Sequence, residues 1–249
     1  MVKNKTIIST QPEAQAQKLF KLLRSNNLLF FSMPLIYTQT IKPNPEIEKN
    51  LKNIKSFTKI IFTSKRGVSS FFELAKEFNL DKNDLRQAEY AAIGTSTAAE
   101  ILKNGFQVNY INRGNTSKEF AEYLLSEVIR PNEKILLPLG NLAPEFLQAK
   151  LSKMADCTRI NVYETIKIKN PDKEILNIID KDNYDLLIFT SPSAFENFIE
   201  ITNYKPDEKQ LKILSIGQTT TGFIETKGFK VQITAKKSSI EGLADIING

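Results

Sequence analysis

The chain has 249 residues, a net charge of +6 from 34 basic and 28 acidic side chains, a single cysteine and no histidine. One cysteine excludes an internal disulfide, and the lack of histidine excludes the usual zinc sites and the commonest general base. The length suits one large or two ordinary domains. The lysines are scattered along the sequence, which argues against a basic stripe that binds nucleic acid. The net positive charge could equally serve to attract an anionic ligand or simply be a solvated surface.

The N-terminal residues MVKNKTIISTQPEAQ contain no apolar stretch of signal-peptide length. The longest apolar run, LLFFSMPLIY from Leu28, is far shorter than the ~20 residues that a membrane crossing needs. We therefore expect a cytoplasmic protein that neither crosses a membrane nor binds nucleic acid, and we expect no metal ion.

The first predicted unit, KTIISTQPEAQAQKLFKLL from Lys5, returns in a weaker form as EKILLPLGNLAPEFLQAKL from Glu133. Each copy reads as a short apolar strand, a polar turn, a proline and a helix. We expect Pro12 and Pro144 in the first helical turn, where a missing N–H costs nothing.

The next unit, IIFTSKRGVSSFFE from Ile60, is followed 127 positions later (187 − 60) by LIFTSPSAFENFIE from Leu187. Both copies place Phe-Thr-Ser between an apolar strand and an amphipathic helix.

A third pair joins AAIGTSTAAEILKNGFQV from Ala91 to LSIGQTTTGFIETKGFKV from Leu214, at an offset of 123 (214 − 91). Hydroxyls at 95–97 and 219–221 are expected to cap the helix that follows. Gly105 and Gly228 are expected to end these helices in the left-handed conformation, before extended structure resumes.

Two extended segments, PLIYTQTIK from Pro34 and RINVYETIKIK from Arg159, lie between these units and could pair as a two-stranded linker. Strands that alternate with helices predict two α/β lobes with parallel sheets covered on both faces. The repeats alone allow either a tandem arrangement of the lobes or one in which the chain crosses between them twice.

The six motifs FTSKRGV, IGTSTA, PLGN, VYET, FTSPSAF and IGQTTT, in this order and spacing, resemble the uroporphyrinogen-III synthase family. The resemblance implies two similar α/β lobes with parallel sheets flanked by helices (flavodoxin/Rossmann-like), joined by a two-stranded β linker. It favours the arrangement with two crossings, in which lobe 1 comprises residues 1–34 and 168–249, lobe 2 comprises 41–160, and the linker comprises 35–40 and 161–167. Gly67 and Gln218 depart from residues common in the family.

The activity implied is closure of hydroxymethylbilane to uroporphyrinogen III, with loss of water and inversion of ring D through a spiro intermediate, in tetrapyrrole (haem) biosynthesis. No cofactor is implied. We expect a monomer that binds this unstable substrate and could contact hydroxymethylbilane synthase transiently. Its catalytic task would be to hold ring D so that the substituted carbon reacts first.

The substrate is a polyanion, and strand-to-helix turns of open α/β sheets present unpaired N–H groups to anions. We expect five such turns around one cleft, where each hydroxyl could instead be a simple helix cap. The candidate substrate-binding residues are Ser64, Arg66, Ser96, Thr97, Gly140, Asn141, Thr165, Ser191, Ser193, Lys212, Gly217, Thr219 and Thr220.

The departing hydroxyl of the substrate needs a proton donor, and the chain offers no histidine. Tyr163 of the VYET segment is our candidate catalytic residue, and Tyr37 in the other linker segment is a weaker one. A tyrosine hydroxyl is a weak acid, which ionises only near pH ~10 in peptides, so its loss should reduce activity rather than abolish it.

Two other classes of protein fit parts of this pattern. A two-lobed binding protein could capture a small anionic ligand without chemistry. A sugar-nucleotide transferase would also have two Rossmann-like lobes, but the chain has no G-x-G-x-x-G turn and is short for that class.

Overall fold

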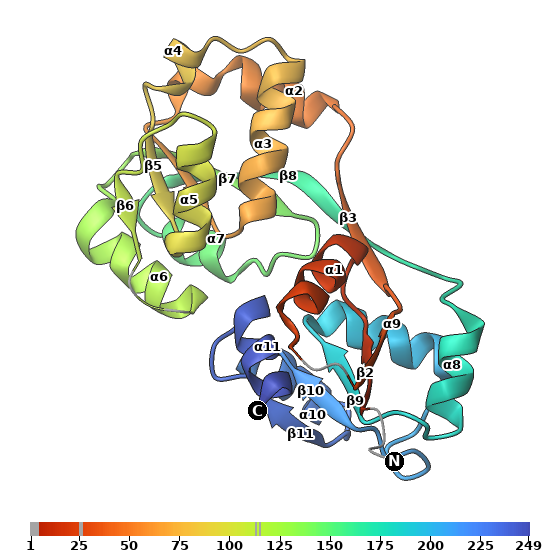
Figure 1. The fold of residues 1–249 in the computed structure, drawn as a ribbon. Coiled ribbons are helices and arrows are strands. Elements are labelled where there is room, and N and C mark those ends of the chain that lie inside the picture. Colours follow the sequence, from red (N-terminus) through yellow and green to blue (C-terminus); the bar gives the residue numbers. More distant parts are fainter. Residues whose placement is uncertain (1–4, 25–26, 113, 115) are drawn as a thin grey trace. The chain divides into compact units, whose positions relative to one another are not determined.

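The computed structural model describes residues 5–24, 27–112, 114 and 116–249. The chain forms two compact units: unit 1 comprises Met1–Tyr37 and Ile166–Gly249, and unit 2 comprises Thr38–Thr165 (Figure 1). The N-terminal segment therefore packs with the C-terminal third of the chain, and the chain passes between the units twice.

Unit 1 is built on a parallel sheet with the order β11-β10-β9-β1-β2. Its strands are β1 (Lys5–Ser9), β2 (Leu28–Ser32), β9 (Leu186–Phe189), β10 (Ile213–Ser215) and β11 (Val231–Thr234). Its helices are α1 (Glu13–Leu22), α8 (Lys173–Asp180), α9 (Pro192–Thr202), α10 (Gln218–Thr226) and α11 (Ile240–Asn248). Neighbouring residues of one strand, such as Ile7 and Ile8, enter different core clusters, so both faces of the sheet are covered by helices.

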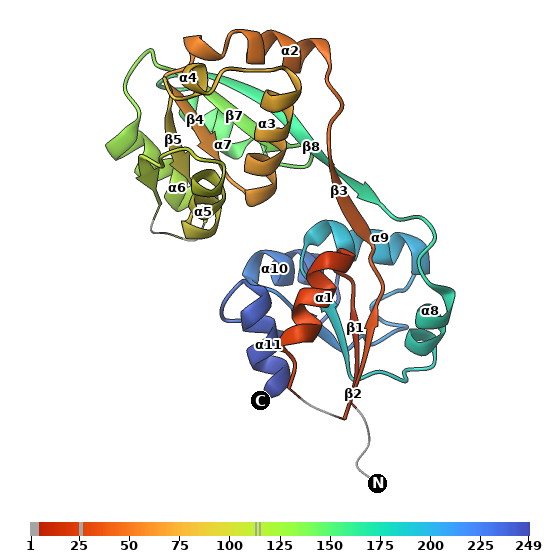
Figure 2. The same ribbon diagram turned by 45° about the horizontal axis from the view of Figure 1, so that its top comes forward.

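Unit 2 contains a six-stranded sheet with the order β3-β8-β7-β4-β5-β6 (Figure 2). Its strands are β3 (Ile36–Thr40), β4 (Lys59–Phe62), β5 (Glu89–Ala92), β6 (Tyr110–Ile111), β7 (Lys134–Gly140) and β8 (Asp156–Lys167). Its helical segments are α2 (Pro45–Lys52), the short 3-10 helix η1 (Ile54–Ser56), α3 (Lys65–Glu77), α4 (Lys82–Leu85), α5 (Thr95–Lys103), α6 (Ser117–Tyr123), the π-helical turn η2 (Leu124–Val128) and α7 (Phe146–Leu151). Ile60 and Ile61 enter different core clusters, so this sheet is also covered on both faces.

The two sheets repeat one strand order, because β2-β1-β9-β10-β11 of unit 1 corresponds to β8-β7-β4-β5-β6 of unit 2. All three internal repeats of the sequence thus fold as matching strand-helix segments, and the predicted α/β class with parallel sheets is confirmed. β8 is a single strand of 12 residues that continues from the unit 2 sheet into the expected linker segment, with β3 as its neighbour.

Helix ends agree with the sequence in part. Gly105 and Gly228 have φ of 86° and 84° directly after the C-caps of α5 and α10, so the predicted left-handed glycines are confirmed. The proline prediction was wrong in detail, because Pro12 is the N-cap of α1 and Pro144 lies two residues before α7. The turn after β7 is longer than its counterpart in unit 1, and the helix starts later.

An ion network around a buried lysine lies at the amino end of the unit 2 sheet. Lys59 is 4% exposed, and its ammonium is 2.6 Å from a Glu133 oxygen and 3.0 Å from a Glu89 oxygen. Burial alone would lower the pKa of Lys59, but its hydrogen bonds to Glu133 and Glu89 outweigh burial and raise the pKa. Burial alone would raise the pKa of Glu133, but the hydrogen bonds from Lys59 and from the Arg130 amide lower it.

We expect Glu133→Gln to lower the free energy of unfolding by about 1–3 kcal/mol at pH 7, because it weakens a charged hydrogen bond to a buried ammonium. The folded-state pKa of Glu133 lies below its unfolded value. Its contribution is therefore present above pH ~4.3 and is lost as the pH falls through the folded-state pKa. Urea denaturation at pH 7 and at decreasing pH below about 5 measures both effects.

The matched control is Glu48→Gln, which removes an exposed i,i+4 pair with Lys52 and should cost no more than about 0.5 kcal/mol. Equal losses for the two variants, or a difference that grows toward acid, would contradict the assignment.

Candidate active site

The Phe-Thr-Ser turns end in serines that cap the next helix. The Ser64 hydroxyl accepts a hydrogen bond from the Gly67 amide at 3.0 Å, and the Ser191 hydroxyl accepts one from the Ala194 amide at 3.2 Å. Ser193 lies 3.1 Å from Ser191, oxygen to oxygen. Both serines occupy the same place after a parallel strand, where their role is to shape the turn.

The glycine turns differ from the expected hydroxyl caps, and that prediction was wrong. Gly94 and Gly217 are the N-caps of α5 and α10, and neither helix has a side-chain cap. Thr97 and Thr220 are each 3% exposed, and their amides donate to the carbonyl oxygens of these glycines. The side chains of Ser96 and Thr219 are exposed. The amides of the first two residues of each helix thus remain uncapped, whereas Thr97 and Thr220 face the core.

The charge at the helix N-termini separates two groups of helices. The first turns of α3, α5, α9 and α10 carry no acidic residue. The short α7 has none in its first turn either, but its N-cap is Glu145. Acidic residues do lie in the first turns of four other helices: Glu46 and Glu48 in α2, Glu119 in α6, Glu174 in α8 and Glu241 in α11. An acid there neutralises the positive end of the helix dipole. The helices that follow the two Phe-Thr-Ser and the two Ile-Gly turns leave that end available to an external anion, and α1, with Glu13, does not.

Tyr163 packs directly on Gly140. The pairing of β7 with β8 shifts between Leu139 and Gly140, so that Leu139 lies opposite Asn161 and Gly140 opposite Tyr163. A Cβ atom on Gly140 would lie 2.5 Å from Cζ and 2.8 Å from the hydroxyl oxygen of Tyr163. The bulge therefore places a glycine where the tyrosine ring passes.

The Tyr163 hydroxyl also lies beside the first Phe-Thr-Ser turn, 3.4 Å from the Ser64 oxygen. Ser64 already accepts the Gly67 amide at 3.0 Å, so its own proton points to the Tyr163 oxygen. The phenol proton of Tyr163 remains available to a substrate.

Asn141 is fixed between two backbone groups of β8. Its amide donates to the Tyr163 carbonyl at 3.0 Å, and its side-chain oxygen accepts the Thr165 amide at 3.0 Å. A backbone N–H can only donate, which assigns the oxygen of the Asn141 side chain to this contact. Its NH₂ group consequently faces away from Thr165. The structure thus brings Ser64, Gly140, Asn141, Tyr163 and Thr165 together within unit 2.

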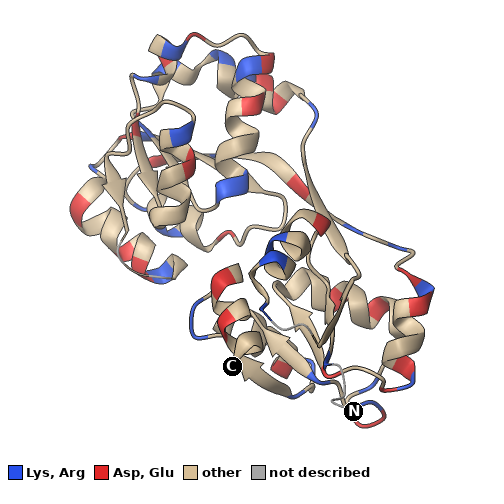
Figure 3. Cartoon of the chain, viewed as in Figure 1, with Lys and Arg blue, Asp and Glu red and all other residues tan. Residues whose placement is uncertain are grey.

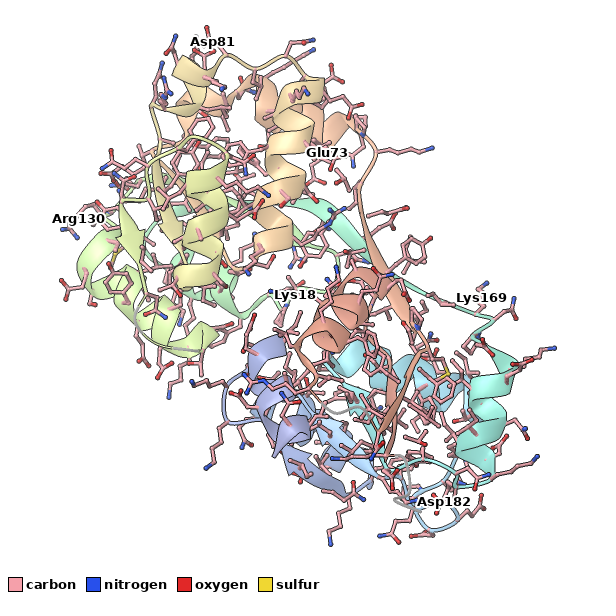
Figure 4. All side chains as sticks on the ribbon, in the orientation of Figure 1. Lys18, Glu73, Asp81, Arg130, Lys169 and Asp182 are labelled. Carbon is pink, nitrogen blue, oxygen red and sulfur yellow. The ribbon has the colours of Figure 1, made fainter. Side chains whose placement is uncertain are left out.

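Arg66 is held beside this group by β3. One of its terminal nitrogens donates to the Thr40 hydroxyl at 3.2 Å, and Thr40 in turn contacts Ser70 and Glu73 of α3, where Glu73 is labelled in Figure 4. The buried Nε of Arg66 has no partner among the described residues. The guanidinium is therefore oriented by Thr40 and only partly engaged.

Lys212 lies elsewhere. It precedes β10, at the amino end of the strand, whereas Gly217 follows the carboxyl end. Its ammonium is 2.9 Å from the Asp182 carboxylate and 2.9 Å from the Tyr184 carbonyl, with Asp182 in the loop before β9 (Figure 4). Within unit 1, the structure does not place Lys212 with Ser191 and Gly217, because a lysine before a parallel strand lies at the opposite end of the sheet from the turns that follow the strands.

Sequence reasoning missed Arg159. Its guanidinium bonds the side-chain oxygen of Asn161 and the carbonyls of Gly140 and Ala143. The signal was present, because strict alternation along β8 places Arg159 on the same face as Asn161 and Tyr163.

Other features do not build a second site. A hollow of about 420 Å³, lined by residues 206–211 and 228–230, precedes β10 and β11 at the amino edge of the unit 1 sheet and mixes acidic with basic side chains. Burial raises the pKa of the Cys157 thiol to about 11, so it is not a thiolate nucleophile at neutral pH. Figure 3 shows basic residues dispersed among acidic ones in the part of the chain that the structure describes. Among the described helices, none combines the length and apolar character needed to cross a membrane.

Each unit has a parallel α/β sheet with helix N-termini beyond the carboxyl ends of the strands, which is the open-sheet α/β class, whose members bind ligands at that end of the sheet. A family model described as uroporphyrinogen-III synthase HemD matches residues 17–245. The chain belongs to this family, and it is an enzyme of porphyrin biosynthesis.

The relatives support this assignment. The uroporphyrinogen-III synthase of Chlorobaculum parvum is 26% identical over 233 residues, which covers 92% of this chain and 92% of the relative. A solved structure of a mutant uroporphyrinogen III synthase from Thermus thermophilus matches with a TM-score of 0.69 and 18% identity, over 97% of this chain and 96% of that one. The uroporphyrinogen-III synthetase structure from Helicobacter pylori 26695 matches with a TM-score of 0.60 and 20% identity, over 97% of each chain. The two structures show the fold.

Proposed function

We propose that each unit binds carboxylates of hydroxymethylbilane at the N-termini of two of its helices, α3 and α5 in unit 2 and α9 and α10 in unit 1. The observation that carries this proposal is the lack of an acidic residue in the first turn of all four helices. Each ring of the substrate carries two carboxylates, and free amides at a positive helix end bind such groups without a lysine at every contact. Further hydrogen-bond donors come from the side chains in these turns and in the turn after β7: Ser96, Ser193, Thr219 and the NH₂ group of Asn141.

We further propose that Tyr163 is the proton donor to the departing hydroxyl of ring A. The carbon–oxygen bond breaks, and the hydroxyl leaves as water with the phenol proton. Ring D attacks the resulting electrophile through its substituted carbon, and the spiro intermediate then breaks and recloses in the inverted order. The phenolate recovers a proton released when the pyrrole rings regain aromaticity. The support is the Ser64 contact, which occupies the Tyr163 oxygen as an acceptor and leaves its proton free.

Hydroxymethylbilane also closes without help to the uninverted isomer I, so the enzyme must hold ring D while the substituted carbon reacts. Many weak contacts suit that task. Because this competing reaction wastes free substrate, we propose transient transfer from hydroxymethylbilane synthase. One chain carries both copies of every turn named above, which supports a monomer as the working unit.

The test supplies the protein with freshly prepared hydroxymethylbilane, oxidises the products and separates the porphyrin isomers. We expect isomer III as the main product, formed faster than isomer I appears in a protein-free sample. If only isomer I forms while the substrate binds, the chain acts as a two-lobed binding protein and the proposed chemistry is wrong.

A further inference from the structure

We propose that Arg159 is a positioning residue, which fixes the turn of residues 140–143 so that the NH₂ group of Asn141 meets a carboxylate of the substrate. This inference rests on the proposed function. It concerns an arginine that would contact the turn rather than the substrate itself.

The guanidinium of Arg159 bridges both ends of this turn. One terminal nitrogen donates to the Gly140 carbonyl at 3.0 Å, and the other donates to the Ala143 carbonyl at 2.9 Å. The Ala143 amide also bonds the Gly140 carbonyl at 3.0 Å, which closes the turn across its ends. The planar fork of arginine therefore fastens two carbonyls whose separation the turn itself sets.

The arginine side chain is in turn oriented from its own strand. Its Nε donates to the side-chain oxygen of Asn161 at 3.0 Å, two residues further along the same face of β8. Three guanidinium nitrogens are thereby engaged, and all of their partners lie on β8 or on the turn. A lysine could satisfy at most part of this pattern, because an ammonium is a point donor on a flexible chain.

Asn141 lies between the two carbonyls that Arg159 holds. Its backbone amide and side-chain oxygen bond Tyr163 and Thr165 of β8, but neither contact restrains the far side of the turn, where Leu142 is 59% exposed. Arg159 restrains that side through Ala143. The direction of the Asn141 NH₂ group is thus determined jointly by β8 and by the arginine.

A carboxylate contact at Asn141 acts in the bound substrate and in the transition state alike, so its loss raises KM and leaves kcat nearly unchanged. We expect Arg159→Lys to raise KM for hydroxymethylbilane about 10-fold, with kcat within about twofold, because a displaced donor weakens an oriented contact. A merely structural defect would reduce the folded fraction, which lowers the apparent kcat and leaves KM as it was.

The matched control is Arg130→Lys. Arg130 precedes β7 at the opposite edge of the same sheet and bonds the Ile129 carbonyl through one terminal nitrogen (Figure 4). We expect neither KM nor kcat to change in this variant. Thermal unfolding of both variants establishes that each is folded at the assay temperature.

A double-mutant cycle tests whether Arg159 acts through Asn141. In an Asn141→Ala background, Arg159→Lys should raise KM by no more than about threefold, and in a Thr219→Ala background it should keep its full effect, because only neighbouring groups couple. An unchanged KM in Arg159→Lys, an unchanged KM in Asn141→Ala, or equal penalties in both backgrounds would each overturn the inference. The variants are compared with a wild-type enzyme that forms isomer III, so any of these results leaves the proposed function unchanged. If the wild-type protein itself does not form isomer III, the proposed function is wrong.

Discussion

Gly140→Ala is expected to lower kcat about 10- to 100-fold, because displacing a reacting group by about 1 Å can cost as much as removing it. The added Cβ would lie 2.5 Å from Cζ, 2.6 Å from Cε2 and 2.8 Å from the hydroxyl oxygen of Tyr163. A Cβ atom essentially never lies this close to a non-bonded atom, so the flexible end of the Tyr163 side chain must move away from Gly140. The hydroxyl of Tyr163 then leaves its place beside Ser64, while the substitution does not touch the N-termini of α5, α9 and α10. Steady-state kinetics with hydroxymethylbilane measures the loss.

Gly222→Ala is the matched control. Gly222 lies within α10, and a Cβ there would meet no atom within 4 Å. Alanine at such a helical position should leave kcat unchanged and raise the free energy of unfolding by about 0.5–1 kcal/mol. A Gly140→Ala enzyme that stays within about threefold of the wild-type kcat would show that the position of Tyr163 does not matter for the reaction.

Tyr163→Phe should lower kcat about 10- to 100-fold and leave KM within about twofold. The substitution removes a proton donor, whose contribution is made in the transition state, and it keeps the ring that packs on Gly140. Water can replace so weak an acid in part, which is why the loss is smaller than for a histidine donor. The product should remain isomer III, because the contacts that hold ring D are intact. Kinetics together with isomer separation measures both quantities.

Tyr123→Phe controls for the loss of a tyrosine hydroxyl. Tyr123 lies in α6, and its hydroxyl forms no hydrogen bond with the described residues, so kcat should not change. If Tyr163→Phe retains the full kcat, the proton donor is another group and the Ser64–Tyr163 pair only packs the turn. If the product shifts to isomer I, Tyr163 orients ring D instead.

The sequence predicted the parts of this fold that depend on neighbouring residues. The apolar runs, the Phe-Thr-Ser turns and the glycines after α5 and α10 each specify a strand, a capped helix or a left-handed end through groups a few positions apart. The repeats at offsets of 127 and 123 positions then indicated that two lobes share one plan. The predicted class of parallel α/β sheets followed from these local patterns.

The roles of individual side chains were harder to predict from the sequence where one pattern allows two explanations. The threonines at positions 97 and 220 looked like caps or ligands, yet they are buried, and Gly94 and Gly217 take the cap position. Lys212 looked like a site residue, yet it lies before its strand and pairs with Asp182. The sequence already placed Lys212 just before its strand, and only the resemblance to the family made it a candidate.

Only the tertiary structure decided which residues meet in the candidate site. Ser64 and Tyr163 are 99 positions apart, and they approach because β4, β7 and β8 are neighbours in one sheet. Gly140 faces Tyr163 because of a register shift in the β7–β8 pairing, and Arg159 reaches the same turn from the next strand. By itself the sequence determined the repeated strand-helix plan, since periodicity and caps are local. Pairing and register arise from contacts between distant segments, whose free energies no short stretch of sequence contains.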